Sequence, residues 1–338
     1  MKKQIKAISA ILITLALLFA VGCGDSTPDA AQTPDSAPAQ DAAAPSDTQP
    51  SGGGAEGLRI GATFYSLQNE FTMRMDNAAQ KWAAENGVIY TGLDGNYDAA
   101  TQLSQVETMI AEGVDAIILN PHDAIASAAA VELAHAAGIP VIGVNTMVES
   151  DLLTSYVGSL DVTAGEGIMQ FMIDHMGRND FNIVVIEGPM GQSAQLQRME
   201  GIENVLAENP NITELARNTA NWSRSEAMML METWLTNFGE DIDAVIAQND
   251  EMALGAREAI DAAGKDIPCI GIDGITDAVT AVIEGRMIAS DFQNAEGQMT
   301  GALEAAVRAI RGEPVEKFYW IPFEMITPAN AQEYVGRY

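Results

Sequence analysis

The chain has 338 residues and a formal net charge of −30, because it contains 17 lysine and arginine residues and 47 aspartate and glutamate residues. This acidic balance argues against nucleic-acid binding, which requires clustered basic side chains. The two cysteines, Cys23 and Cys269, allow no framework of several disulfides, so ordinary hydrophobic cores must hold the folded part. The length is ample for two domains.

The N-terminal segment has the order of an export signal, with basic residues in Met1–Lys6 and an apolar run from Ile8 to Val21. The run is shorter than the roughly 20 residues of a membrane-spanning helix. It ends at Leu18-Phe-Ala-Val-Gly-Cys23, which resembles the bacterial lipobox. The resemblance implies a cleaved signal peptide, 1–22, and acyl chains such as palmitate on Cys23; a plain signal peptide with an incidental cysteine is the alternative. We expect an extracytoplasmic, membrane-anchored lipoprotein at the cell surface or in the periplasm.

A linker is predicted over residues 23–57. From Gly24 to Gly57 the chain consists of small and polar residues with almost no aliphatic bulk, so it cannot bury enough surface to fold. Aspartates recur along it and repel one another, which favours extended conformations. We expect a flexible tether between the membrane and the folded part.

From Leu58 onward, short apolar runs alternate with helical patterns, as in repeated βαβ units with parallel sheets. The runs are continuous rather than alternating, which is typical of strands covered on both faces. Strands are predicted at Leu58–Phe64, Val88–Leu93, Ala116–Asn120, Val141–Val144, Ser155–Gly158, Asn182–Glu187, Ala244–Ala247, Cys269–Ile272 and Met287–Phe292. Helices are predicted around Phe71–Asn86, Ala99–Glu112, Ser127–Ala137, Ala164–Met176, Ala194–Glu208, Ser225–Asn237, Met252–Ala263, Asp277–Glu284 and Glu296–Arg311.

The same rhythm restarts at Asn182, which predicts two α/β domains of similar build. Ligands of open α/β sheets bind outside the carboxyl ends of the strands, so two such domains facing each other would form a cleft lined by strand-end loops.

Polar side chains collect where the predicted strands end. Most carry planar amide, carboxylate or guanidinium groups, whose paired donors or acceptors match the vicinal hydroxyls of a sugar. Trp222 adds a flat apolar face for sugar C–H groups. Individually, Asn120 before Pro121 and Asp273 before Gly274 also fit turns, and Trp222 also fits a core position. The polar residues are Asn69, Asn120, Asn145, Arg198, Arg224, Asn249, Asp273 and Gln293.

Residues 58–338 resemble the ribose-binding family of periplasmic proteins. The most specific stretch is Ala244-Val-Ile-Ala-Gln-Asn-Asp-Glu-Met-Ala-Leu-Gly-Ala256. Gly191-Gln-Ser-Ala194 leading to Arg198, Ile270-Gly-Ile-Asp-Gly274 and Ile117-Ile-Leu-Asn-Pro121 are also similar to the family. The resemblance implies two Rossmann-like parallel-sheet domains joined by a three-segment hinge. It assigns sugar contacts to Asn69, Phe71, Asn120, Asn145, Arg198, Trp222, Arg224, Asn249, Asp273 and Gln293.

The resemblance also implies domain boundaries. The N-terminal domain would comprise 58–159 and 294–322, and the C-terminal domain 160–293 and 323–338, with hinge strands near Leu160, Gln293 and Pro322. Gln293 would then sit at the hinge, where it senses closure.

Three positions depart from the family pattern. Asn145-Thr146 stands where an aspartate followed by arginine is common, Thr72 replaces a second aromatic beside Phe71, and Ile272 rather than an aromatic precedes Asp273. The stacking faces would therefore be Phe71 and Trp222. Another pentose, a hexose or a cyclitol is therefore as reasonable a ligand as ribose.

We interpret the chain as a solute-binding protein that captures a sugar or polyol in an interdomain cleft and delivers it to the permease subunits of an ABC importer. We expect a monomer without cofactor or metal. A sensory co-receptor for a chemoreceptor or kinase would use the same binding chemistry and is the alternative. An enzyme is less favoured, because only His122, His135 and His175 are available and Gly188-Pro-Met-Gly191 lacks the features of a phosphate loop. A sugar-responsive repressor would carry a basic helix-turn-helix before its core, where this chain has a signal and an acidic linker.

Overall fold

The computed structural model describes residues 55–337. The signal peptide, Cys23 and the linker up to residue 54 therefore lie outside the described residues. The described part contains two six-stranded sheets. Within it, no helix is long and apolar enough to cross a membrane.

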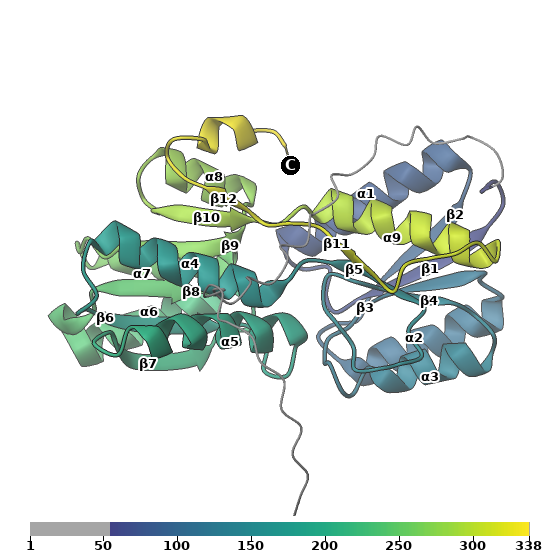
Figure 1. Ribbon diagram of the computed structural model, residues 1–338, viewed down its shortest axis with the longest axis horizontal. Coiled ribbons are helices and arrows are strands. Elements are labelled where there is room, and N and C mark those ends of the chain that lie inside the picture. Colours follow the sequence, from purple (N-terminus) through teal and green to yellow (C-terminus); the bar gives the residue numbers. More distant parts are fainter. Residues whose placement is uncertain (1–54, 338) are drawn as a thin grey trace, which may run out of the picture. The chain divides into compact units, whose positions relative to one another are not determined.

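The first sheet, here the N-terminal sheet, has the strand order β11-β5-β4-β3-β1-β2, and all its pairings are parallel. Helices cover both of its faces (Figure 1). Successive residues of one strand point to opposite faces: Ile118 packs with α1 and α9, whereas Ile117 packs with α2 and α3. The elements are β1 (Arg59–Phe64), α1 (Glu70–Asn86), β2 (Ile89–Asp94), α2 (Ala99–Glu112), β3 (Ala116–Asn120), α3 (Ala128–Ala136), β4 (Val141–Val144), β5 (Ser155–Gly158), α9 (Ala295–Ile310) and β11 (Phe318–Trp320).

The second sheet, here the C-terminal sheet, has the order β12-β10-β9-β8-β6-β7. Its pairings are parallel except that β12 runs antiparallel to β10. Helices α4 and α5 pack on one face and α6, α7 and α8 on the other (Figure 1). The elements are α4 (Asp161–Met176), β6 (Asn182–Glu187), α5 (Ser193–Glu208), β7 (Thr213–Thr219), α6 (Arg224–Phe238), η1 (Gly239–Asp241), β8 (Ala244–Ala247), α7 (Asp250–Ala262), β9 (Cys269–Asp273), α8 (Thr276–Ile283), β10 (Ala289–Phe292), β12 (Glu324–Ile326) and η2 (Ala331–Tyr334).

The chain passes between the two sheets three times. It leaves the N-terminal sheet after β5, returns after β10 and leaves again after β11. Two parallel-dominated α/β sheets with three crossings confirm the predicted fold class.

Two helices that follow strands begin with asparagine caps, and the caps hold these polar side chains in place. Asn69 caps α1, and its Oδ1 accepts a hydrogen bond from the Thr72 N–H at 3.1 Å. Asn249 caps α7 in the same way, with the Met252 N–H at 2.9 Å. Because each cap directly follows the loop from a parallel strand, both amides lie at the carboxyl edge of a sheet.

Candidate ligand-binding site

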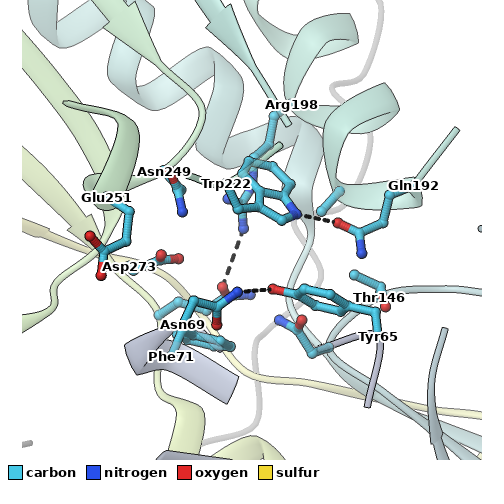
Figure 2. Close-up of a pocket in the computed structure, with 13 residues that line it drawn as sticks. Tyr65, Asn69, Phe71, Thr146, Gln192, Arg198, Trp222, Asn249, Glu251 and Asp273 are labelled. Carbon is cyan, nitrogen blue, oxygen red and sulfur yellow. Dashed lines mark hydrogen bonds between the residues drawn. The ribbon is translucent and has the colours of Figure 1, made fainter. Parts of the chain in front are cut away.

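A pocket with about 360 Å³ of empty space, solvent at its mouth included, lies between the carboxyl ends of the two sheets (Figure 2). The N-terminal sheet contributes residues that follow β1 and β4. The C-terminal sheet contributes residues that follow β6, β7, β8 and β10, together with Asp273 at the end of β9. The lining residues are Tyr65, Asn69, Phe71, Asn145, Thr146, Gln192, Ala194, Arg198, Trp222, Asn249, Glu251, Asp273 and Gln293.

The two capping amides present nitrogen rather than oxygen to the pocket. The Oδ1 atoms of Asn69 and Asn249 are occupied by the helix N–H groups that they cap. The Asn69 Nδ2 donates to the Tyr65 hydroxyl at 3.2 Å, and that hydroxyl keeps its own proton for another acceptor. In Figure 2 the amide nitrogen of Asn249 points into the pocket. A ligand oxygen at this edge would therefore meet hydrogen-bond donors.

Arg198, on α5, is the buried cation of the site. Its Nε donates to Asp161 Oδ1 at 2.8 Å, its Nη1 to the Gln248 carbonyl at 2.5 Å and its Nη2 to Gln293 Oε1 at 3.2 Å. Burial alone would lower the pKa of Arg198, but the carboxylates of Asp161 and Asp273 outweigh it and raise that pKa. The guanidinium therefore stays charged and is held in one orientation.

Asp273, at the end of β9, is the buried carboxyl group of the pocket. Burial raises its pKa well above the ordinary value, Arg198 opposes the rise, and the neighbouring Asp250 and Glu251 add to it. Its backbone has φ 134°, a conformation that non-glycine residues rarely adopt. The following loop is fixed by Asp250, whose Oδ2 accepts from the N–H groups of Gly274 at 2.6 Å and Ile275 at 3.1 Å.

Two aromatic side chains give the pocket its apolar faces. Phe71 and Trp222 are almost completely buried and come from different sheets. The Trp222 indole donates through Nε1 to Gln192 Oε1 at 2.6 Å, and the Arg198 Cζ lies 5.5 Å from its ring centroid. A Cβ on Gly188 would come within 2.1 Å of the same ring, so only glycine leaves room for the indole there.

Eight of the ten residues predicted as sugar contacts line this pocket, and Asn120 and Arg224 do not. Asn120 is fully buried behind the wall, where its Nδ2 donates to Val144 O at 3.1 Å and to Thr146 Oγ1 at 2.9 Å. It therefore supports the Asn145-Thr146 turn instead of lining the cavity.

Arg224 begins α6 and bonds two carboxylates: its Nε donates to Glu251 Oε2 at 2.7 Å and its Nη1 to Asp277 Oδ2 at 2.9 Å. It lines an adjoining groove that it shares with Asn69, Trp222 and Glu251. Its guanidinium therefore holds the wall residue Glu251 from outside the pocket.

Five lining residues were not predicted. Tyr65 directly follows β1 and Glu251 lies just past Asn249, so a stricter use of the strand-end rule would have included both. Thr146 was noted only as a departure from the family pattern. Gln192 lies within the family-like Gly191-Gln-Ser-Ala194 segment, but nothing in the sequence indicates that its amide meets an indole 30 positions away. Ala194, the fifth, contributes only a methyl group.

Within residues 55–337, no group of three or more histidine, cysteine, aspartate or glutamate side chains is placed to hold a metal ion. The absence of a cofactor stays a prediction.

The two α/β sheets are linked by three crossings and line a polar pocket with two aromatic faces. This arrangement defines a two-lobed solute-binding protein, in which each sheet with its helices forms one lobe. The chain belongs to the periplasmic binding protein family, because residues 60–314 match the model described as a periplasmic binding protein domain. This confirms the family predicted from the sequence.

Relatives with known names support the assignment. The chain is 40% identical over 259 residues to the xylitol-binding protein of Mycolicibacterium smegmatis, covering 76% of this chain and 74% of that protein. It is 33% identical over 322 residues to the ribose import binding protein of Bacillus subtilis, covering 95% and 99%. Among solved structures, an ABC transporter solute-binding protein from Bacillus halodurans with bound myo-inositol matches with a TM-score of 0.80 and 38% identity, covering 85% of this chain and all of that one.

Proposed function

We propose that this protein captures a sugar or polyol in the pocket between its sheets and delivers it to an ABC importer. The observation that carries the proposal is the convergence of planar polar groups and two aromatic faces from both sheets on one small cavity. Amide and guanidinium donors bind hydroxyl oxygens, the Asp273 carboxyl binds hydroxyl protons, and Phe71 and Trp222 cover C–H faces.

The ligand contacts that we propose are the eight predicted residues on the pocket wall, with Tyr65, Gln192 and Glu251 added. Asn120 and Arg224 act through the residues that they hold. The relatives' ligands are xylitol, ribose and myo-inositol by name, which supports a small polyhydroxylated ligand without choosing among a pentose, a pentitol and a cyclitol.

We infer that the protein binds its ligand without transforming it. The Thr146 hydroxyl donates to Pro121 O at 2.8 Å and accepts from Asn120, so no base activates it. Burial raises the pKa of Tyr65, which keeps that hydroxyl protonated. The pocket wall includes no histidine. Import is favoured over a sensory role because the named relatives are an import binding protein and ABC solute-binding proteins.

We propose that the domains follow the boundaries predicted above, with segments 58–159 and 294–322 in one and 160–293 and 323–338 in the other. The support is that β11 belongs to one sheet and β12 to the other, on either side of Pro322. We propose further that Cys23 carries a lipid anchor after removal of residues 1–22. The support is the lipobox-like sequence and the linker composition.

The test is a thermal-shift screen against pentoses, hexoses, pentitols and cyclitols, followed by calorimetry on each hit. A ligand at 100 times its Kd stabilises the native state by about 2.7 kcal/mol, which raises the melting temperature by several degrees. A protein that none of these compounds stabilises would contradict the proposed function. Loss of uptake of the identified ligand after deletion of the gene would support transport, whereas intact uptake with loss of a signalling response would support the sensory alternative.

A further inference from the structure

The side chain of Gln192 lies between the Trp222 indole and the opposite wall of the pocket (Figure 2). It is only 1% exposed. The Trp222 Nε1–H is a donor only, so the amide atom 2.6 Å away must be the Gln192 oxygen. The indole therefore fixes which end of the amide points where, and Nε2 points away from Trp222.

The Gln192 amide nitrogen carries more N–H groups than the protein uses. Its one acceptor among residues 55–337 is the Pro121 carbonyl at 3.5 Å, the outer limit of a hydrogen bond. That carbonyl already accepts from the Thr146 hydroxyl at 2.8 Å. Since an amide nitrogen carries two N–H groups, at least one remains for a ligand.

The neighbouring wall offers little competition for this role. Both the donor and an acceptor site of the Thr146 hydroxyl are used within the protein, and the Asn145 Oδ1 accepts from Asn120 Nδ2 at 3.3 Å. This is the wall on which the sequence departs from the family's charged pair. The Gln192 Nε2 and the Asn145 Nδ2 are therefore neutral donors that this wall offers to a ligand.

The segment that carries Gln192 also contacts the N-terminal lobe on both sides of it. The Ala124 N–H donates to Gly191 O at 3.1 Å, and the Met147 N–H donates to Ser193 Oγ at 2.6 Å. These two bonds hold the backbone around Gln192 against the opposite lobe, and the Trp222 bond orients its side chain, so less conformational freedom is lost when the amide binds a ligand.

We infer that Gln192 is a specificity-determining residue, which holds Trp222 through Oε1 and donates through Nε2 to a hydroxyl oxygen of the bound polyol. The inference rests on the proposed function and names a contact that it requires. It selects ligands with an oxygen at the position facing Nε2, and it rejects analogues that lack that oxygen.

The experiment pairs protein variants with ligand analogues. Wild type, Gln192→Leu and Gln192→Glu are titrated by calorimetry with xylitol, ribose and myo-inositol, and then with each monodeoxy analogue of the tightest binder. Gln332→Glu is the matched control, because it makes the same change at an exposed residue outside the pocket wall. Unfolding midpoints of the unliganded variants check folding.

Both Gln192 variants should bind on the order of tenfold to a hundredfold more weakly than wild type, and Gln332→Glu within about threefold of it. One deoxy analogue should lose a similar factor with wild type but lose almost nothing further with Gln192→Leu. If every analogue loses the same factor with both proteins, Gln192 does not contact the ligand. If Gln192→Glu binds like wild type while Gln192→Leu does not, its role is only to hold Trp222, and the inference fails. A wild type that binds none of the three polyols contradicts the proposed function and this role together.

Discussion

Asp161 and Arg198 form an ion pair with both side chains almost completely buried, at 2.8 Å between Oδ1 and Nε. Asp161 is the first residue of α4, directly after the chain first crosses between the sheets, and Arg198 lies on α5. Burial raises the pKa of Asp161 and the guanidinium opposes the rise. The carboxylate therefore neutralises the cation that lines the pocket, and it does so from behind the wall.

Replacing Asp161 with Ala should leave Arg198 buried without its partner. Removing one member of a buried pair typically lowers the free energy of unfolding by about 3–5 kcal/mol. Asp161→Asn should cost less, because an amide oxygen still accepts from Nε. Chemical denaturation measures both effects, and Asp174→Ala, on the exposed side of α4, is the control with an expected change within about 0.5 kcal/mol. Equal stabilities of Asp161→Ala and Asp174→Ala would show that the pair is not needed.

Arg198→Ala and Asp273→Ala should each weaken ligand binding by one to several factors of ten, because each removes a buried hydrogen-bonding group from the pocket wall. Arg224→Ala serves as the matched control, since the structure brings this arginine to Glu251 and Asp277 and not to the pocket wall. We expect its affinity to change by less than about fivefold. Calorimetry with the ligand found in the screen measures the affinity of each variant. Wild-type affinity in Asp273→Ala would contradict its assignment as a ligand contact. A larger loss of affinity in Arg224→Ala than in Arg198→Ala would contradict the placement of Arg198, and not Arg224, on the pocket wall.

The fold could be predicted from the sequence because most strands are buried on both faces, so their sequences are continuous apolar runs. The predicted Ala116–Asn120, Val141–Val144 and Ser155–Gly158 coincide with β3, β4 and β5. By contrast, β7 (Thr213–Thr219) was not predicted. Its sequence TELARNT is mostly polar because it is an edge strand in which no residue is buried. β11 and β12 were missed because three residues carry too little pattern.

Most of the pocket was predictable for a related reason. Parallel strands end at one edge, so polar residues after strands converge there whichever strand they follow. Arg224 satisfied the same rule but is turned outward by two carboxylates, one of which, Asp277, lies 53 positions away. Gln192 has its role through its contact with Trp222, and side-chain pairing of this kind leaves no periodic trace in the sequence.

Asp291, on β10, should make stability depend on pH. It is 5% exposed, and burial is the main reason that its pKa is raised to about 7, with Arg198 opposing and Asp250 and Asp161 adding to the rise. An unfolded aspartate has a pKa of about 3.9. The folded state thus holds a proton that the unfolded chain has lost, so the stabilisation is complete below pH 4 and disappears as the pH rises to about 7.

Asp291→Asn imitates the protonated form and should therefore melt higher than wild type at pH 8, by a few degrees, and close to wild type at pH 4. Differential scanning calorimetry at both pH values measures the difference, with the exposed Asp174→Asn as control. A difference in melting temperature that does not change between pH 4 and pH 8 would mean that Asp291 has the same protonation state in the folded and unfolded chain.

Cys23→Ser should release the protein from the membrane. A lipid anchor depends on one thiol, and a single acyl chain holds only marginally, so loss of the modified cysteine leaves no comparable attachment. Fractionation of cells that express the full chain, with immunoblotting of the membrane and soluble fractions, measures the distribution; Cys269→Ser is the control, because Cys269 is buried in the C-terminal sheet. A Cys23→Ser protein that remains with the membrane would contradict the lipoprotein proposal.

The last prediction concerns closure of the pocket around its ligand. The Met147 N–H, beyond β4, donates to Ser193 Oγ, at the start of α5, with a distance of 2.6 Å. This bond joins the two lobes, so it exists only when they are in contact, and it adds to the ligand's preference for the closed state. Ser193→Ala removes the acceptor while keeping a residue that is well suited to a helix.

Ligand should therefore dissociate from Ser193→Ala about two- to tenfold faster than from wild type, because one hydrogen bond contributes roughly 0.5–1.5 kcal/mol. The association rate should change little, since encounter precedes formation of the bond. Stopped-flow measurement gives both rates, and Ser225→Ala on α6 is the control.

Small-angle scattering should show a smaller radius of gyration when wild type is saturated with ligand. An unchanged radius, together with an unchanged dissociation rate in Ser193→Ala, would mean that the lobes do not close on the ligand. Capture would then depend on a pocket of one fixed conformation.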